Sequence, residues 1–243
     1  MLKNNKFLLI FNPASGKKRA IYDKGSIINY LEQNNIGTEI FFTEYKGHAR
    51  DYLQTIKKDS FSSILVYGGD GTFNEVINGI LSRLDSYNPI IGFIPGGSGN
   101  SVMHHLGILN PIKSLFPIIK NKVRKIDIMK ICYADSIEYS INILGWGMVA
   151  DIGALSEKLR YLGPLRYNIA SLVYIAYKKH RYAKIIIDNN EYKGNYLFIL
   201  ASNTKYTGQG MMVAPNAKLD DGLIDLIIVK NNISKFELIQ LLP

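Results

Sequence analysis

The sequence has a single cysteine and lacks any long apolar run. Cys132 is the only cysteine among 243 residues, which excludes an internal disulfide bond and a cysteine metal cluster. No apolar run approaches the roughly 20 residues that a membrane-spanning helix needs. The N-terminal run from Phe7 to Phe11 is too short for the core of a signal peptide. Low-complexity tracts are also missing, and these absences together predict a folded cytoplasmic protein.

Acidic residues are scarce relative to basic ones. There are 20 Asp and Glu against 29 Lys and Arg, which gives a formal net charge of +9. Nucleic acid, an anionic membrane surface and a polyphosphate ligand are the partner classes that such a charge fits. Basic residues cluster at 17–19, 120–125 and 178–184. Solvated faces account for most of this charge, and no nucleic-acid recognition motif accompanies it. We therefore expect peripheral membrane association and no nucleic acid partner.

The stretch SILVYGGDGTFNEVINGILSRL, residues 63–84, joins an apolar run, a glycine-rich turn and an amphipathic pattern. The run predicts a buried strand. After the turn, apolar residues recur with helical spacing and are expected to line one face of a helix: Phe73, Val76, Ile77, Ile80, Leu81 and Leu84. The order strand, glycine turn and helix is typical of a phosphate-binding site. Glycines let the backbone approach an anion closely, and the N-terminus of the helix favours negative charge. Asp70 in this turn can hold a metal or take a proton from a nucleophile; the alternative is an ordinary tight turn.

Two further turns of this kind follow predicted strands. The strand at 7–11 precedes NPASG, residues 12–16, and the strand at 90–94 precedes PGGSGN, residues 95–100. Helices are predicted after these turns at 17–33 and 101–106, and a strand at 40–42 leads through Thr43 to a helix at 47–57. Alternating strands and helices predict a parallel sheet with helices on both faces and ligands beyond the carboxyl ends of the strands. We therefore expect the three turns to converge.

From about residue 122 the pattern changes to consecutive strands. We expect strands at 125–129, 138–144, 184–188, 196–202 and 223–229, and one helical insertion at 156–179. Consecutive strands predict antiparallel pairing and a separate β-rich domain. The predicted fold class is α/β, with a parallel nucleotide-binding domain at 1–120 and a β-rich, β-sandwich domain at 121–243. Ser234 and Glu237 form a capping box before an apolar helix at the chain end, so we expect this domain to be incomplete at its C-terminus.

In combination, these motifs resemble the diacylglycerol-kinase-like lipid kinase superfamily. The resemblance rests on NPASGKKRA at 12–20, GGDGTFNEVINGI at 68–80 and IPGGSGN at 94–100, in this order. GGDG alone also resembles phosphofructokinases and NAD kinases. Two later segments, 146–166 and 207–229, are more similar to the sphingosine kinase and ceramide kinase branch, and an NAD kinase would not explain the first of them.

The resemblance implies ATP-dependent transfer of the γ-phosphoryl group to the hydroxyl of a sphingoid base, ceramide or diacylglycerol, with the nucleotide between the two domains. Such transfer needs cations around the phosphates and an acid that orients or deprotonates the attacking hydroxyl. By motif match, Asp70 is this acid. The expected nucleotide-binding residues are Asn12, Ser15, Gly16, Thr43, Gly68, Gly69, Gly71, Thr72, Glu75, Ser98, Gly99, Asn100, Arg160 and Arg166.

Other acids fall in positions that the resemblance links to Mg2+. Asp127 matches an acid in a magnesium–water network, and Asp220 and Asp221 match aspartates that support a structural metal. Mg2+ prefers oxygen ligands and retains waters, which suits scattered carboxylates. A hairpin turn at Asp221 and Gly222 is the equal alternative. His104 and His105 have no cysteine partners, and histidines of this kind are more often packing or surface residues than ligands.

The lipid acceptor is expected near Trp146, Met148 and Asp151. Sphingosine kinases carry a second acid, which binds the substrate amine, where this sequence has Gly153; this departure leaves ceramide, diacylglycerol or another neutral lipid open. The late acid-bearing segment of the family is not found after Val229. A catalytically impaired nucleotide- or lipid-binding relative of the same fold is therefore the alternative function, and either reading is compatible with a homodimer.

Overall fold

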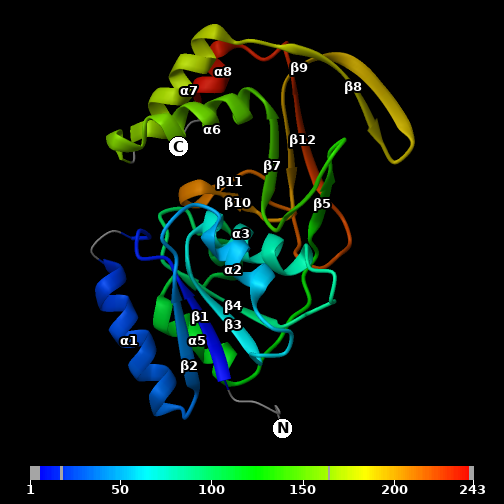
Figure 1. Cartoon of the computed structure of the whole chain (residues 1–243). Coiled ribbons are helices and arrows are strands. Elements are labelled where there is room, and N and C mark those ends of the chain that lie inside the picture. Colours follow the sequence, from blue (N-terminus) through cyan, green and yellow to red (C-terminus); the bar gives the residue numbers. More distant parts are fainter. Residues whose placement is uncertain (1–5, 17–18, 164, 241–243) are drawn as a thin grey trace. The chain divides into compact units, whose positions relative to one another are not determined.

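The chain forms two compact units, which are described separately. The computed structural model in Figure 1 describes residues 6–16, 19–163 and 165–240, apart from the side chains of Arg160 and Gln209. Unit 1 comprises Met1–Asn142 and Asn203–Leu223, and unit 2 comprises Ile143–Ser202 and Ile224–Pro243. The division into domains at 1–120 and 121–243 stays a prediction.

A four-stranded parallel sheet forms the centre of unit 1. Its strand order is β2-β1-β3-β4. The strands are β1 (Lys6–Phe11), β2 (Gly37–Phe42), β3 (Ser63–Gly68) and β4 (Ile90–Pro95). β1 pairs with β2 from Lys6 opposite Gly37 and with β3 from Phe7 opposite Ser63, while β3 pairs with β4 from Ser63 opposite Ile90. The predicted parallel sheet is confirmed.

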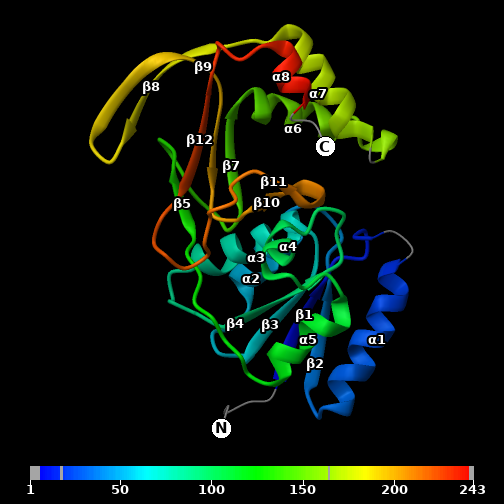
Figure 2. The same cartoon turned by 180° about the vertical axis from the view of Figure 1, so that it is seen from behind.

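Helices cover both faces of this sheet. They are α1 (Arg19–Gln33), α2 (His48–Thr55), α3 (Asp70–Leu81), α4 (Ser101–Leu106) and α5 (Pro111–Ile119). Alternate strand residues face opposite sides. Leu8 and Ile10 pack in a core with α2 and α3, which Figure 1 shows in front, whereas Leu9 packs with α1 and α5, which Figure 2 shows in front.

Two features of these helices differ from expectation. α3 ends at Leu81, so Leu84 lies beyond the helix and is fully exposed instead of lining its apolar face. Helix α5 was not predicted from the sequence, although its N-terminus has a local sequence signal. The Asn110 side chain accepts hydrogen bonds from the N–H groups of Ile112 and Lys113, at 2.9 and 3.0 Å, and Pro111 occupies the first helical position.

The remainder of unit 1 consists of short strands. β5 (Met129–Cys132) pairs with β6 (Ile137–Ser140), and β10 (Tyr206–Thr207) pairs with β11 (Met211–Met212) across the 3-10 helix η2 (Gly208–Gly210). The strand predicted at 125–129 is wrong except for its last residue. The backbone N–H of Asp127 donates to the carbonyl of Leu219 at 2.6 Å, and the Asn203 side chain donates to the Asp127 carbonyl at 2.7 Å. These contacts replace a strand ladder.

Unit 2 contains an antiparallel sheet with helices packed against it. Its strands are β7 (Ile143–Gly147), β8 (Arg181–Ile187), β9 (Asn190–Ser202) and β12 (Asp225–Lys230). The order is β12-β9-β7, and β8 also pairs with β9. The helices are α6 (Met148–Lys158), the 3-10 helix η1 (Arg160–Leu162), α7 (Leu165–Tyr177) and α8 (Lys235–Gln240). Met148, Ile175, Leu197 and Leu238 form part of the shared core.

The predicted class, α/β with a β-rich second part, is confirmed, but some boundaries are wrong. The single strand predicted at 138–144 is two strands, β6 and β7, in different sheets. The single helix predicted at 156–179 is divided among the end of α6, the 3-10 helix η1 and α7, and Gly163 after η1 has a φ of 60°, which does not continue an α-helix. The predicted capping box is confirmed, because Ser234 Oγ accepts the Glu237 N–H at 3.1 Å and Glu237 Oε2 accepts the Ser234 N–H at 2.7 Å. None of the described helices is both long and apolar enough to cross a membrane.

Candidate active site

The three glycine-bearing turns of unit 1 meet at the carboxyl ends of β1, β3 and β4. A Cβ atom on Gly16 would lie 2.7 Å from the carbonyl oxygen of Gly96, and one on Gly97 would lie 2.4 Å from the Cα of Gly69. Real Cβ atoms do not approach backbone this closely without displacement, so only glycine allows the turns to pack backbone against backbone. The predicted convergence of the three turns is therefore confirmed.

Asp70 lies where these turns meet. It is the first residue of α3, after Gly69 at the N-cap, and it is half-buried. Its Oδ1 accepts the backbone N–H of Ser101 at 2.7 Å, and its Oδ2 accepts the Ser101 hydroxyl at 3.2 Å. Burial raises the pKa of Asp70, while the hydrogen bonds from Ser101 and Val102 and the charge of His104 oppose that rise. The result is a carboxylate more basic than an ordinary aspartate.

Predicted nucleotide-binding residues hold these turns together. Asn12 Nδ2 donates to Thr72 Oγ1 at 2.8 Å, which ties the first turn to α3. In the third turn, Asn100 Oδ1 accepts the Gly97 N–H at 3.0 Å and its Nδ2 donates to the Gly97 carbonyl at 2.7 Å. The side chains of Asn12 and Asn100 thus have internal partners, and their role towards a nucleotide stays a prediction.

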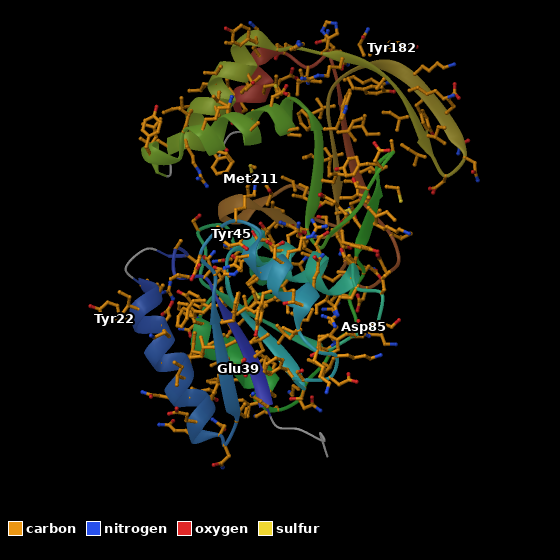
Figure 3. All side chains as sticks on the ribbon, viewed as in Figure 1. Tyr22, Glu39, Tyr45, Asp85, Tyr182 and Met211 are labelled. Carbon is orange, nitrogen blue, oxygen red and sulfur yellow. The ribbon has the colours of Figure 1, made fainter. Side chains whose placement is uncertain are left out.

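Other predicted contacts lie along the same edge of the sheet. Thr43 follows β2, is buried, and donates its N–H to the Phe11 carbonyl at 3.0 Å. Thr43 directly follows Phe42, the last residue of β2, and Figure 3 labels Glu39 on this strand and Tyr45 shortly after it in the chain. Exposure differs among the remaining members of the set in unit 1. Gly16, Gly71 and Ser98 are exposed, Ser15, Glu75 and Gly99 are half-buried, and Gly68 is buried.

A partly buried network beneath the turns was missed from sequence. Tyr67, at the end of β3, is fully buried, stacks on Phe11 at 4.4 Å, and donates its hydroxyl to Asp23 Oδ2 at 2.7 Å. Arg19 Nε lies 3.2 Å from the same oxygen. The Tyr67 ring also limits Gly96, because a Cβ there would come within 2.6 Å of it. The network therefore anchors α1 to the sheet directly below two of the turns.

The segment at 205–210 packs against α4. His105 Nδ1 accepts the Lys205 N–H at 3.0 Å, and burial lowers the pKa of His105. The His104 ring packs on Gly210, where a Cβ would lie 3.0 Å from the ring carbon Cε1. Both histidines thus make packing contacts, as the sequence favoured. Sequence patterns could not predict this contact, because the two segments are about a hundred residues apart in the chain.

The acids predicted near Mg2+ have protein partners. Asp220 forms hydrogen bonds and an ion pair with Arg124, at 3.1 and 2.8 Å, which lower the pKa of Asp220. Asp127 Oδ2 accepts the Gly222 N–H at 2.7 Å, and Asp221 Oδ1 accepts the Leu223 N–H at 3.1 Å. Across the described residues, no group of three or more His, Cys, Asp or Glu side chains is arranged to hold a metal ion. These carboxylates therefore do not fit a metal cage made by the protein alone.

The remaining predicted residues belong to unit 2. Asp151 on α6 forms an ion pair with Arg181, whose Nη2 lies 2.8 and 3.0 Å from its two oxygens. Arg166 stacks over Tyr167, with 4.9 Å from the guanidinium carbon to the ring centre, and lies 3.8 Å from Glu157. Two further side chains differ in exposure: Met148 is buried, and Trp146 is 38% exposed. Arg160 begins η1, and its side chain lies outside the described part of the structure.

Comparison with protein families gives two matches. The family described as "Diacylglycerol kinase catalytic domain" matches residues 6–131, and "YegS C-terminal NAD kinase beta sandwich-like domain" matches residues 142–243. The matched regions include the three turns and Asp70 in the first case and the sheet of unit 2 in the second.

Individual proteins are similar over nearly the whole chain. Sphingosine kinase 1 of Arabidopsis thaliana is 28% identical over 93% of this chain and 57% of its own length. Diacylglycerol kinase of Bacillus subtilis (strain 168) is 30% identical over 94% of this chain and 75% of its own. A solved structure of a putative diacylglycerol kinase from Bacillus anthracis str. Sterne has a TM-score of 0.81, with 26% identity, over 99% of this chain and 80% of that one. The chain thus spans little more than half the length of the plant relative.

Proposed function

Because the chain belongs to the diacylglycerol kinase catalytic domain family, we propose that it is a lipid kinase that transfers the γ-phosphoryl group of ATP to a lipid hydroxyl. The observation that carries this proposal is the Asp70 carboxylate at the meeting point of three glycine-bearing turns. Backbone N–H groups at such turns and at the start of α3 suit phosphate groups. A basic carboxylate beside them suits the deprotonation of an attacking hydroxyl.

In the proposed reaction, Asp70 takes the proton of the lipid hydroxyl. The hydroxyl oxygen forms a bond to the γ-phosphorus, the bond from that phosphorus to the β,γ-bridging oxygen breaks, and ADP leaves with the electron pair. The raised pKa of Asp70 favours proton uptake, because a stronger base gains more from the transfer. Gly68, Gly69, Gly71 and Thr72 are the proposed phosphate contacts, and Arg160 and Arg166 the proposed cations.

Mg2+ is proposed to bind mainly through the nucleotide. In kinases it usually contacts one or two carboxylates together with substrate phosphates and waters, and it neutralises charge on the phosphates. Within the described part of the structure, Asp127 uses Oδ2 for the Gly222 N–H and has no hydrogen bond at Oδ1, which allows such a single contact, whereas both oxygens of Asp220 face Arg124. We therefore retain Asp127 as the metal-facing candidate and assign Asp220 to the Arg124 ion pair.

A neutral lipid is the proposed acceptor. Asp151 is the acid predicted near the acceptor, but its charge is balanced by Arg181 at 2.8 Å. A carboxylate already paired with a guanidinium offers little additional attraction to the amine of a sphingoid base. The pairing therefore favours ceramide or diacylglycerol, as does Gly153 where a second acid was expected.

A peripheral membrane surface is the proposed place of action. On α7, the apolar residues Leu165, Leu172 and Tyr177 are exposed by half or more. Lys178 and Lys179 follow directly in the chain. Exposed apolar groups beside lysines suit the interface of an anionic bilayer. Association with vesicles that contain phosphatidylserine, and its loss in high salt, would test this part of the proposal.

The deciding experiment supplies γ-labelled ATP, Mg2+ and mixed micelles of ceramide, diacylglycerol or sphingosine. We expect labelled lipid from a neutral acceptor. Asp70→Asn should lower turnover at least a thousandfold, in keeping with the loss of a general base and its orientation, while ATP binding measured by calorimetry stays within a few-fold. Asp135→Asn, an exposed aspartate in the turn between β5 and β6, is the matched control. ATP binding without labelled lipid from any acceptor would favour the catalytically impaired alternative.

A further inference from the structure

Ser101 holds the Asp70 carboxylate through two different groups. Its backbone N–H donates to Oδ1 at 2.7 Å, and its hydroxyl donates to Oδ2 at 3.2 Å. The two bonds engage both carboxylate oxygens, so they define the plane of the carboxylate as well as its position. The contact joins residues 31 positions apart, at the start of α4 and the start of α3.

The surroundings fix Ser101 itself. It is 1% exposed, and it follows Asn100, whose φ of 52° and whose side-chain bonds to Gly97 close the third turn. Gly99 also lies close to the carboxylate, because a Cβ at that position would lie 2.7 Å from Asp70 Oδ2. The buried hydroxyl therefore has little freedom to leave the carboxylate.

The partners around Asp70 are nearly all uncharged. Ser101, Val102 and Gly99 carry no charge, and His104 on α4 is the titratable side chain that acts on Asp70 among the described residues. A neutral donor orients a carboxylate with a smaller loss of basicity than a guanidinium or ammonium would cause. Ser101 is thus suited to hold a base in place while leaving it able to accept a proton.

We propose that Ser101 is the positioning residue that orients Asp70 towards the lipid hydroxyl during phosphoryl transfer. This inference rests on the proposed function of Asp70 as the base. The hydroxyl is the part of Ser101 that substitution can remove, because the backbone N–H remains in any variant. Its loss removes the Ser101 bond to Oδ2 and gives the carboxylate more freedom to rotate about its Cβ–Cγ bond, so fewer encounters have a productive geometry.

The test compares Ser101→Ala with the wild-type protein. We expect kcat to fall about tenfold, the change that corresponds to one lost hydrogen bond to a charged group, with KM for ATP within twofold. The acidic limb of the kcat profile should move to higher pH, because the carboxylate loses a donor that favours its charged form. Ser101→Thr retains the hydroxyl and should recover most of the turnover.

Ser114→Ala is the matched control. Ser114 is also a buried serine of unit 1, 2% exposed, and its hydroxyl donates to the Pro111 carbonyl on α5 at 2.6 Å. A general effect of deleting a buried hydroxyl would appear in both variants, without a shift of the pH profile in Ser114→Ala. Equal kcat and an unmoved acidic limb in Ser101→Ala would overturn the inference.

A second measurement separates this inference from the proposed function. The 13C signal of the Asp70 carboxyl, assigned by its absence in Asp70→Asn, gives the titration midpoint without any turnover. We expect a higher midpoint in Ser101→Ala and an unchanged one in Ser114→Ala. A wild-type protein that phosphorylates no lipid would defeat the kinase proposal alone, whereas an unshifted midpoint in Ser101→Ala would defeat the role of Ser101 alone.

Discussion

Removal of the Tyr67 hydroxyl should destabilise unit 1 more than removal of a comparable hydroxyl elsewhere. Tyr67 and Tyr87 are both buried, at 0% and 4% exposure. Tyr67 donates to the Asp23 carboxylate at 2.7 Å, whereas Tyr87 donates to the neutral carbonyl of Phe61 at 3.0 Å. Substitution by Phe preserves each ring and deletes only the hydroxyl, so the two variants differ in the charge of the acceptor.

The magnitudes follow from these acceptors. A hydrogen bond to a charged group contributes about 1.5–3 kcal/mol, against about 0.5–1.5 kcal/mol for a neutral pair. In Tyr67→Phe, Asp23 stays mostly buried, with 15% of its side chain exposed, and keeps only Arg19 at 3.2 Å. We therefore expect a loss of about 2 kcal/mol for Tyr67→Phe and about 1 kcal/mol for Tyr87→Phe. At about 2–4 °C per kcal/mol for a chain of this size, the Tm should fall by about 4–8 °C and 2–4 °C respectively.

Thermal unfolding followed by far-ultraviolet circular dichroism at pH 7 measures both losses. Burial, followed by the hydrogen bond to Asp23, raises the pKa of Tyr67 above its ordinary value of 10.0. Ionisation in the unfolded chain therefore subtracts stability from the wild type above about pH 10, a loss that Tyr67→Phe does not share. The difference in stability between the wild type and Tyr67→Phe should therefore become smaller above this pH. A Tyr67→Phe variant as stable as Tyr87→Phe would refute the reasoning from the charged acceptor.

Two further outcomes follow from packing and capping. Gly96→Ala should lower stability by about 1–3 kcal/mol and weaken ATP binding, because the new Cβ would meet the pinned Tyr67 ring at 2.6 Å; unchanged affinity in a calorimetric titration would contradict this. Ser234→Ala should cost about 1 kcal/mol as the cap of α8 is lost. The Ser234 N–H lowers the pKa of Glu237, so the contribution of Glu237 is present at neutral pH and is lost as the pH falls through its lowered pKa; chemical denaturation at pH 7 and pH 3 would measure that loss.

The sequence predicts the part of the site that depends on local chemistry. Glycine turns after apolar strands are local signals, and parallel topology then brings their carboxyl ends to one edge, as Gly16, Gly69 and Gly97 confirm. The capping box at Ser234 and the strands β1 to β4 are local in the same sense. Local patterns also fail where a tertiary partner replaces the ladder, as at Asp127, which bonds to Leu219 and Asn203 instead of a neighbouring strand.

The positioning contacts could not be predicted, because they join residues distant in sequence. Tyr67 lies 44 residues from Asp23, and Ser101 lies 31 residues from Asp70. Each of these side chains is ordinary in its own segment: a tyrosine in an apolar strand and a serine at a helix start. Their roles depend on which groups the sheet brings opposite them, and that information becomes available only with the register and helix placement.

Asp70 differs from the other acids predicted at the site in the groups that contact its carboxylate. Asp220 is paired with Arg124, which lowers the pKa of Asp220 and opposes proton uptake, and Asp151 is paired with Arg181. Asp70 instead has neutral donors from Ser101 and a pKa raised by burial. Proton transfer from a hydroxyl requires a carboxylate that is fixed and still basic, and neutral donors in a shielded turn meet both requirements. The choice of Asp70 as the proposed base therefore follows from its partners as well as from its motif.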